Sequence, residues 1–267
     1  MKAELSNHND PQGLLRALLV STASTAAPMR PRSDLPQAAI EVIPSSPVGP
    51  VLAALSQRGV AMIHFLRHPA DVSAAIARLR RRFDPVPETG ASHGLRDELN
   101  GFAGGDLTAL RSNIDLSLVA GSFQKRILEL LIEVGAGALV TYSSLAAWAG
   151  APEASRAVGA AMHDNPIPVY VPCHRVVRSD LSLGGYGGGL EIKRKLLSVE
   201  GFTFAASGRV SEAGAVWGNR ATKIFCRPEC HWVARARRTN LVLFRDRARA
   251  VEAGMRPCSR CRMFPLA

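Results

Sequence analysis

With 267 residues, of which 47% are hydrophobic, the chain is long enough to bury a sizeable core and does not have the composition of a disordered protein. It contains no charge-free apolar run of about 18 residues, so no transmembrane helix is expected. The net charge is +11, and residues 205–267 carry most of it, with 13 Lys and Arg against 4 Asp and Glu. A basic tail on a nearly neutral body indicates contact with a polyanion, although a solvated tail would look the same.

The N-terminal stretch carries mixed signals for export. Residues 1–12 are polar and include a proline, so we expect a flexible N-terminus. Leu14–Ala27 is apolar and rich in small residues, as in a signal peptide, but Arg16 interrupts it and acidic residues precede it. These charges favour a cytoplasmic protein.

Residues 13–114 combine short apolar runs with one clear helix. Val60–Phe65 is an apolar run typical of a strand. Asp71 can cap a helix over Val72–Arg82, whose apolar residues lie at helical spacing. Together these patterns predict a small α/β domain, in which we find no catalytic motif.

Three short helices are predicted after Asp115. Phe123–Val134 is amphipathic, Thr141 is a suitable N-cap for Tyr142–Ala149, and Pro152 precedes a third helix over Glu153–Asp164. Their tight turns resemble a helix-turn-helix arrangement. The third helix is thin enough to approach a groove closely, although small residues also suit ordinary helix packing. Its small residues include Ala154, Ala157, Gly159, Ala160 and Ala161.

A cysteine–histidine pair follows a proline-rich segment. Pro168 and Pro172 predict a stiff, mostly extended approach to Cys173. His174 is the nearest base for the thiol, but neighbours in an extended segment point to opposite faces, so contact needs a kink or a bridging water. Glu200 could orient the imidazole. By itself, such a pair is more often structural than reactive.

The other four cysteines form two close pairs in the basic tail. Cys226 and Cys230 are separated by three residues, and Cys258 and Cys261 by two. An odd total of five argues against a disulfide framework. The simplest partition is one reactive thiol, Cys173, and one structural zinc ion held by four thiolates, with four unligated thiols as the alternative.

A long motif around Cys173 resembles the active site of the O6-alkylguanine-DNA alkyltransferase family. It consists of Asn165-Pro166-Ile167-Pro168, Val171-Pro172-Cys173-His174-Arg175-Val176-Val177, the glycine-rich stretch 184–190, and Leu196-Leu197 followed by Glu200-Gly201. Read alone, the glycine run could be a phosphate cradle or a flexible loop. The resemblance covers residues 115–201 strongly and 14–113 only in general pattern.

This resemblance implies an α/β + α fold. A small N-terminal α/β domain of ribonuclease-H-like type would span 13–114, and a helical, winged helix-turn-helix-like catalytic and DNA-binding domain would span 115–203. It also implies DNA repair by direct reversal, in which the alkyl group of O6-alkylguanine, and of O4-alkylthymine, moves irreversibly to Cys173 in a single turnover. No cofactor would be required for that transfer. The implied partner is double-stranded DNA, bound by a monomer through the minor groove with little sequence specificity and no membrane.

The resemblance also implies a role for each matching residue. His174 and Glu200 would complete a water-linked relay to Cys173. Arg156 matches the arginine that fills the gap left by an extruded base, and Tyr142 matches the tyrosine that rotates the nucleotide and protonates guanine N3. The recognition helix would contain Ala154, Ala157, Gly159 and Ala160. In the base pocket, Tyr186 would line the wall, Gly187 would offer its N–H to O6, Pro168 would shape the wall, and Asn165 would brace the site.

The tail resembles the zinc domain of the bacterial adaptive-response protein Ada over residues 217–267, after a linker at 204–216. In that domain the first cysteine accepts a methyl group from a DNA phosphotriester, and it corresponds here to Cys226. The spacing between the pairs is one residue longer here, and the part before Trp217 is truncated. Two readings therefore stay open: methyl acceptance at Cys226, or a structural module that adds DNA affinity.

Other classes of function are compatible with parts of the sequence. A zinc-containing DNA-damage sensor or a transcription regulator would also carry a basic cysteine-rich tail, and a cysteine hydrolase would also carry a Cys–His pair. The combination of Cys173 with His174 and Glu200 disfavours a sensor, and we find no segment for a regulator's separate DNA-binding domain. Repair is the leading prediction.

Overall fold

The computed structural model describes residues 35–44, 46, 48–68, 70–87 and 94–262, so the predicted flexible N-terminus and the signal-like stretch Leu14–Ala27 lie outside the described residues. The chain forms two compact units. The first is Met1–Phe102 with Thr108–Leu118, and the second is Ala103–Leu107 with Val119–Ala267. Within the described residues, none of the helices combines the length and apolar composition that crossing a membrane requires.

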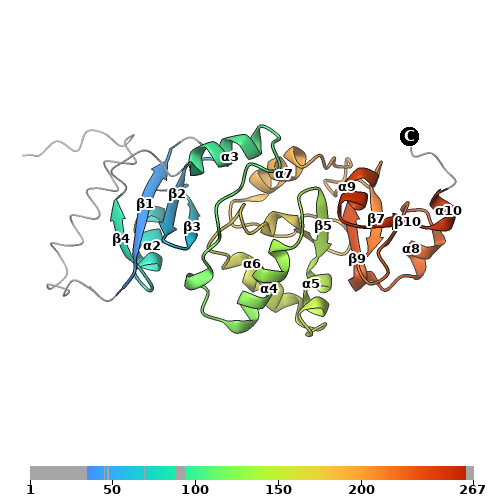
Figure 1. Ribbon diagram of the computed structural model, residues 1–267, viewed down its shortest axis with the longest axis horizontal. Helices are drawn as coiled ribbons and strands as arrows, with labels where there is room; N and C mark the ends of the chain where they lie inside the picture. Colours follow the sequence, from blue (N-terminus) through green and yellow to red (C-terminus); the bar gives the residue numbers. More distant parts are fainter. Residues whose placement is uncertain (1–34, 45, 47, 69, 88–93, 263–267) are drawn as a thin grey trace, which may run out of the picture. The chain divides into compact units, whose positions relative to one another are not determined.

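The first unit is built on a four-stranded sheet in the order β3-β2-β1-β4 (Figure 1). β1 and β2, and β2 and β3, pair antiparallel, whereas β4 runs parallel to β1. The parallel pair needs a crossover, which α2 supplies between β3 and β4. The bounds are β1 (Gln37–Ile43), β2 (Val51–Ser56), β3 (Gly59–Phe65), α2 (Ala70–Leu79), β4 (Asp84–Pro87) and α3 (Leu95–Ala103).

The predicted strand and helix of this unit are confirmed as β3 and α2, with the helix ending three residues earlier than expected. The predicted N-cap is wrong. Asp71 lies inside the first turn of α2, and its carboxylate accepts the backbone N–H groups of Arg67 at 2.6 Å and His68 at 2.8 Å instead. The apolar face of α2 packs on the sheet, with Val72, Ile76 and Leu79 in a common core with β1 and β2.

The second unit confirms the three predicted helices, each within two residues of the expected ends: α4 (Ser122–Ile132), α5 (Tyr142–Trp148) and α6 (Ser155–His163). Thr141 caps α5 as predicted, because its hydroxyl accepts the N–H of Ser144 at 3.0 Å. A fourth helix, α7 (Leu190–Val199), ends at the C-cap residue Glu200.

A six-stranded sheet in the order β10-β8-β7-β9-β5-β6 runs through the second unit. β5 and β6 flank the segment that contains Cys173, whereas the other four strands come from the basic tail. The tail joins through antiparallel pairing of β9 with β5, in which Ala138 faces Phe244 and Leu139 faces Leu243. The strands are β5 (Ala138–Thr141), β6 (Val176–Val177), β7 (Val216–Asn219), β8 (Ile224–Cys226), β9 (Leu241–Phe244) and β10 (Arg256–Pro257).

One hydrophobic core extends from the Cys173 region into the tail. It contains Leu139 and Leu197 from the first part of the unit and Trp217 and Leu243 from the tail. The stretch 204–216, predicted as a linker, contributes to this core through the buried Val210 and Ala215. The remaining short elements are the 3-10 turns η1 (Leu116–Leu118), η2 (Cys173–Arg175) and η3 (Arg238–Asn240), and the helices α8 (His231–Arg235), α9 (Arg247–Glu252) and α10 (Ser259–Arg262).

Candidate active site and four-cysteine cluster

The approach to Cys173 is a closed loop, so the prediction of an extended segment is wrong. Val171 donates its N–H to the carbonyl of Ile167 at 2.8 Å, and Val169 has a φ of 77°, which is strained for a β-branched residue. Asn165 closes the loop, since its Oδ1 accepts the N–H of Ile167 and its Nδ2 donates to the carbonyl of Val171, both at 3.0 Å. Cys173 then opens the 3-10 turn η2, so the backbone turns at Cys173 and His174 and does not continue as an extended segment.

The thiol of Cys173 lies in a buried environment, with 5% of the residue exposed. Burial raises its pKa, because the thiolate loses hydration. A hydrogen bond from the Asn165 side chain and the positive charge of Lys193 act in the opposite direction. The site therefore needs both a proton acceptor and a stabilising charge before Cys173 can act as a nucleophile.

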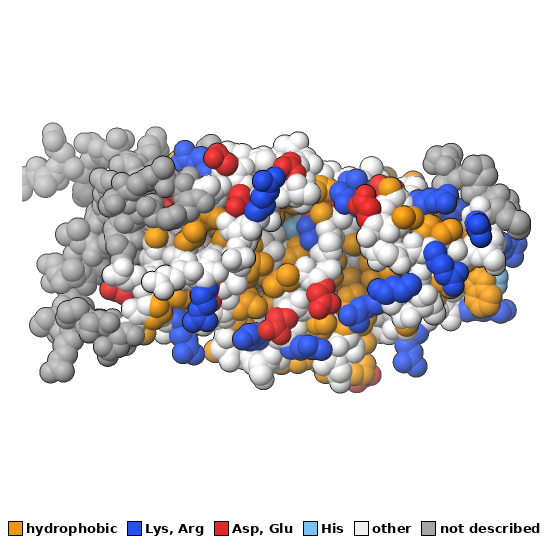
Figure 2. Space-filling view, in the orientation of Figure 1, with side chains coloured by type: hydrophobic (Ala, Val, Ile, Leu, Met, Phe, Trp, Pro, Cys, Tyr) orange, Lys and Arg blue, Asp and Glu red, His pale blue; other side chains and the backbone are white. Residues whose placement is uncertain are grey.

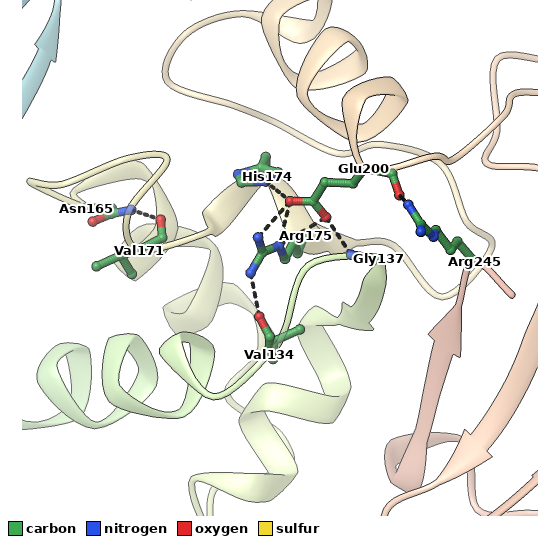
Figure 3. A network of polar contacts seen from close by, with 8 residues as sticks. All are labelled: Val134, Gly137, Asn165, Val171, His174, Arg175, Glu200 and Arg245. Carbon is green, nitrogen blue, oxygen red and sulfur yellow. Dashed lines mark hydrogen bonds and ion pairs between the residues drawn. The ribbon is translucent and has the colours of Figure 1, made fainter. Parts of the chain in front are cut away.

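His174 is fully buried and bound to Glu200, with 2.9 Å between its Nε2 and Oε1 of the carboxylate (Figure 3). Burial lowers the pKa of His174 more than the attraction of Glu200 raises it, so the imidazole is neutral near pH 7. A carboxylate can only accept, which assigns the proton to Nε2. Nδ1 is then the basic nitrogen of the ring.

Glu200 is the centre of a buried polar network that joins distant parts of the unit. Arg175 donates to it from Nε at 2.8 Å and pairs through its terminal nitrogen at 2.7 Å, and Gly137 donates its N–H at 3.0 Å (Figure 3). Arg175 also donates to the carbonyl of Val134 at 2.6 Å. Burial alone would raise the pKa of Glu200, but Arg175 and His174 outweigh it and lower the value to about 2. The carboxylate is therefore ionised throughout the neutral range.

Lys193 is a site residue that the sequence reasoning missed. It is fully buried, and its ammonium donates to the carbonyls of Val176 at 2.6 Å, Leu183 and Gly185. Burial lowers its pKa to about 8, against the opposing effect of Cys173. A signal for it was present, because Lys193 lies three and four residues before Leu196 and Leu197, on the apolar stripe of a helix, where a lysine needs a specific partner.

Cys173 affects the pKa of both tyrosines that were predicted from the sequence as site residues. Burial raises the pKa of Tyr142 and raises that of Tyr186 well above the usual value, and in each case the charge of Cys173 adds to the effect. Gly184 lies against the Tyr142 hydroxyl, where a Cβ atom would come within 2.8 Å. Of the other predicted pocket residues, Pro168 is buried and Gly187 is exposed.

Helix α6 presents Arg156 and two of its small residues outward. Val158, Ala161 and Met162 pack inward, whereas Arg156, Ala157 and Ala160 are exposed. Gly159 is half-buried, and Ala154 is the N-cap residue. Packing within the described unit therefore does not account for Ala157 and Ala160, and the face they form is bare enough for close approach to a partner.

The four tail cysteines come together as the sequence predicts. Their Sγ atoms all lie within 4.8 Å of one another, and all four residues are buried. The parallel pairing of β8 with β10, in which Pro257 faces Phe225, brings the two cysteine pairs side by side. A tetrahedral zinc ion with bonds of about 2.3 Å needs sulfur atoms about 3.8 Å apart, so this donor set fits zinc. We call residues 217–262 the zinc module.

A cavity of about 460 Å³ opens beside this cluster, and its walls include Cys226 and Cys258 but neither of the other two cysteines. Trp217 and Trp232 contribute aromatic surface, and Trp232 is 54% exposed. Arg235 and Arg256 add positive charge. On the face shown in Figure 2, Lys and Arg side chains gather over the zinc module, whereas the middle of the molecule carries charges of both signs.

Two family models match the chain. One, described as the 6-O-methylguanine DNA methyltransferase DNA binding domain, matches residues 122–202, and the other, described as the metal binding domain of Ada, matches residues 206–263. A methylated-DNA–protein-cysteine methyltransferase of Mycobacterium bovis is 42% identical over 115 residues, which cover 43% of this chain and 68% of the relative. One from Methanosarcina barkeri is 34% identical over 155 residues, covering 58% and 92%.

Among solved structures, the crystal structure of Mycobacterium tuberculosis OGT in complex with DNA is similar to this chain. The TM-score is 0.51 at 34% sequence identity, and the match covers 61% of this chain and 92% of the other. The first family model covers the segment that carries Cys173, His174 and Glu200.

Proposed function

The chain belongs to the methylated-DNA–protein-cysteine methyltransferase family, and we propose that it repairs DNA by direct reversal, moving the alkyl group of O6-alkylguanine, and of O4-alkylthymine, irreversibly to Cys173. The observation that carries this proposal is the buried Cys173 next to a neutral His174 whose Nε2 is bound to an ionised Glu200. That arrangement provides a nucleophile and a base in a dry site, which is what a single alkyl transfer requires.

The proton and the alkyl group move in a balanced sequence. The Cys173 proton passes through a bridging water to Nδ1 of His174, and Glu200 stabilises the imidazolium. The thiolate attacks the alkyl carbon, so the S–C bond forms while the C–O6 bond breaks. The departing guanine takes a proton at N3 from Tyr142, which recovers one from His174. Burial raises the pKa of Tyr142 and keeps its phenol protonated for this step.

Lys193 and Asn165 support the same step. The Lys193 ammonium stabilises the thiolate, and Asn165 holds the loop that aims Cys173. The thioether product is a poor leaving group, so each chain acts once. No cofactor is needed for this transfer.

DNA would be bound through the exposed face of α6. A thin helix can approach the minor groove, with Ala154, Ala157, Gly159 and Ala160 lying close to the backbone. Extruding the damaged nucleotide costs a few kcal/mol, which insertion of the exposed Arg156 into the vacated space would offset in part. The extruded base would then meet a pocket formed by Pro168, Tyr186 and Gly187.

We also propose that the chain has the domain organisation predicted from its sequence. The order β3-β2-β1-β4, with β4 parallel to β1, supports a ribonuclease-H-like domain at 13–114. Helices α5 and α6 next to β5 and β6 support a winged helix-turn-helix-like domain at 115–203, followed by 204–216 and the structural zinc module. A flexible segment at 1–12, a monomeric state and a cytoplasmic location stay predictions from the sequence.

A second acceptor, Cys226, is favoured by the cavity beside the cysteine cluster. A zinc ion held by Cys226, Cys230, Cys258 and Cys261 would keep their thiols deprotonated. Of the two cysteines in the cavity wall, Cys258 accepts a hydrogen bond from the N–H of Cys261 at 3.3 Å, which lowers the electron density on its sulfur. Cys226 is then the better nucleophile for a methyl group on a DNA phosphotriester, whose backbone Arg235 and Arg256 could bind.

Peptide mass mapping tests both acceptors. After incubation with an O6-methylguanine duplex, one methyl group per chain on Cys173 supports repair, whereas turnover indicates a hydrolase and binding alone indicates a sensor or regulator. After incubation with methylphosphotriester DNA, an unmodified Cys226 peptide rejects the second acceptor. The Arg156→Ala variant tests the DNA model, because it should slow repair of a duplex about tenfold but leave reaction with a free O6-alkylguanine base unchanged.

A further inference from the structure

Arg245, a residue of the zinc module, contacts both Glu200 and Gly137, one of the residues that bind the Glu200 carboxylate. Arg245 donates its backbone N–H to the carbonyl of Gly137 at 2.9 Å, and its guanidinium donates to the carbonyl of Glu200 at 2.9 Å (Figure 3). Gly137 in turn donates its own N–H to the Glu200 carboxylate at 3.0 Å. Hydrogen bonds therefore join Arg245, Gly137 and Glu200 in a closed ring, and the Glu200 carboxylate of this ring also binds His174.

The fold leaves room for this arginine at two glycines. A Cβ atom on Gly201 would lie 2.8 Å from the terminal nitrogen of Arg245, and one on Gly137 would lie 3.2 Å from its Cδ. Both glycines have positive φ values, 87° and 76°. Asp246 holds the other side of the guanidinium through a 2.9 Å bond from Nε. The side chain is thus seated by shape and by hydrogen bonds on more than one side.

The position of Arg245 depends on how the zinc module docks. Arg245 directly follows β9, and Gly137 directly precedes β5. The antiparallel register of β9 with β5 therefore places Arg245 opposite Gly137. A second contact lies on α5, where the indole N–H of Trp148 donates to the carbonyl of Thr239 at 2.8 Å. Arg220 stacks over the same indole, 4.7 Å from the ring centre. The module is therefore attached on both sides of Tyr142, at β5 and at the end of α5.

We propose that Arg245 is a positioning residue for alkyl transfer at Cys173, through which the zinc module sets the placement of Glu200. The inference rests on the proposed transfer to Cys173. A displaced carboxylate would orient the His174 ring less well, and errors of about 1 Å in such supports can cost up to about a hundredfold in rate. The zinc module is then part of the alkyl-transfer site, beyond any chemistry of its own cysteines.

Single-turnover transfer from a saturating O6-methylguanine duplex tests the proposal. Arg245→Met keeps the aliphatic part of the side chain beside Gly137 and Gly201 and removes the guanidinium. The limiting rate constant for methyl transfer should therefore fall about tenfold, while the Kd for DNA is unchanged. Arg245→Lys can restore one bond to the Glu200 carbonyl and should recover part of the rate. Arg249→Met is the matched control, because Arg249 also lies beside Gly137 but forms its ion pair with the exposed Glu252.

Amide hydrogen exchange gives a readout that is independent of activity. Peptides covering 134–141 and 196–202 should exchange faster in Arg245→Met than in the wild type or in Arg249→Met, and zinc chelation should have the same effect. Transfer by Arg245→Met at the wild-type rate overturns the inference, as does equal slowing in the Lys and Met variants. A wild-type chain that transfers no methyl group defeats the proposed function instead, so the two failures are distinguishable.

Discussion

The second unit contains two cysteine centres, Cys173 and the four-cysteine cluster, which differ in what surrounds their thiols. Cys173 is a lone buried thiol, followed in the chain by a buried network that runs from His174 through Glu200 to Arg175 and on which we propose that its reactivity depends. The four tail cysteines are brought together by short strands and turns, and their sulfur atoms lie within 4.8 Å of one another, a donor set that fits zinc. Hydrogen bonds and charge would stabilise the thiolate of Cys173, whereas a metal ion would stabilise the thiolates of the four-cysteine cluster.

The comparison also shows that the two centres are not independent. The hydrophobic core that contains the four tail cysteines also contains Leu139, Val177 and Leu197, and the β5–β9 pair joins the strands that flank Cys173 to those of the tail. Replacing Cys173 itself should remove chemistry and leave the fold intact, whereas changes at the cysteine cluster should remove the local fold first.

Replacing the nucleophile should have the largest effect on activity. Cys173→Ser should lower single-turnover methyl transfer at least about a thousandfold, because a serine hydroxyl is not ionised near neutral pH. The melting temperature should stay within a few degrees of the wild-type value, since the change is nearly isosteric. If the variant still restores guanine at the wild-type rate, Cys173 is not the acceptor.

Removing one metal ligand should have the largest effect on the fold. In Cys261→Ser, zinc content should fall well below one ion per chain, since structural zinc sites contribute binding free energies on the order of 10 kcal/mol. Amides of Leu241–Phe244 should lose protection from hydrogen exchange. Native mass spectrometry measures the metal, with Cys173→Ser as the control that should keep it. Full zinc content in Cys261→Ser would remove that residue from the ligand set.

Glu200→Gln should lose both activity and stability. The buried Arg175 would lose its counter-charge, which costs about 3 kcal/mol of unfolding free energy, and methyl transfer should fall about a hundredfold. Glu191→Gln, at an exposed position on the same helix, is the control.

The pH dependence of stability follows from the same group. The pKa of Glu200 is lowered from its usual 4.5 to about 2, so its contribution is fully present above pH 4.5 and is lost as the pH falls through about 2. Chemical denaturation between pH 2 and 5 should show this loss, up to about 3 kcal/mol, in the wild type. A slope of the same size in Glu200→Gln would assign the dependence to other carboxylates.

Lys193→Met should have the smallest of these effects. Without the ammonium, the pKa of the Cys173 thiol rises further, and methyl transfer should slow about tenfold at neutral pH. Single-turnover rates measure the change against Lys195→Met, which alters an exposed lysine of the same helix. Equal rates in both variants would show that the Lys193 charge does not support the thiolate.

The sequence by itself determined the local elements and the local chemistry. The periodicity of Phe123–Val134, the cap at Thr141 and the spacing within each cysteine pair all depend on residues a few positions apart, so they can be read directly. The motif around Cys173 likewise predicted the neighbouring base and, through the family resemblance, Glu200. The prediction of an extended approach to Cys173 failed because the Asn165 side chain closes the backbone into a loop. It binds the backbone of Ile167 and of Val171, which lie two and six residues after it.

Only the tertiary structure decided how the zinc module joins the alkyl-transfer site. The bonds of Glu200 to Gly137 and to Arg245 connect residues separated by 63 and 45 positions. The β5–β9 pairing that places Arg245 likewise connects segments about a hundred residues apart. Such contacts depend on which apolar faces pack together and in which register, and that is settled by the free energy of the whole core rather than by any short stretch of sequence.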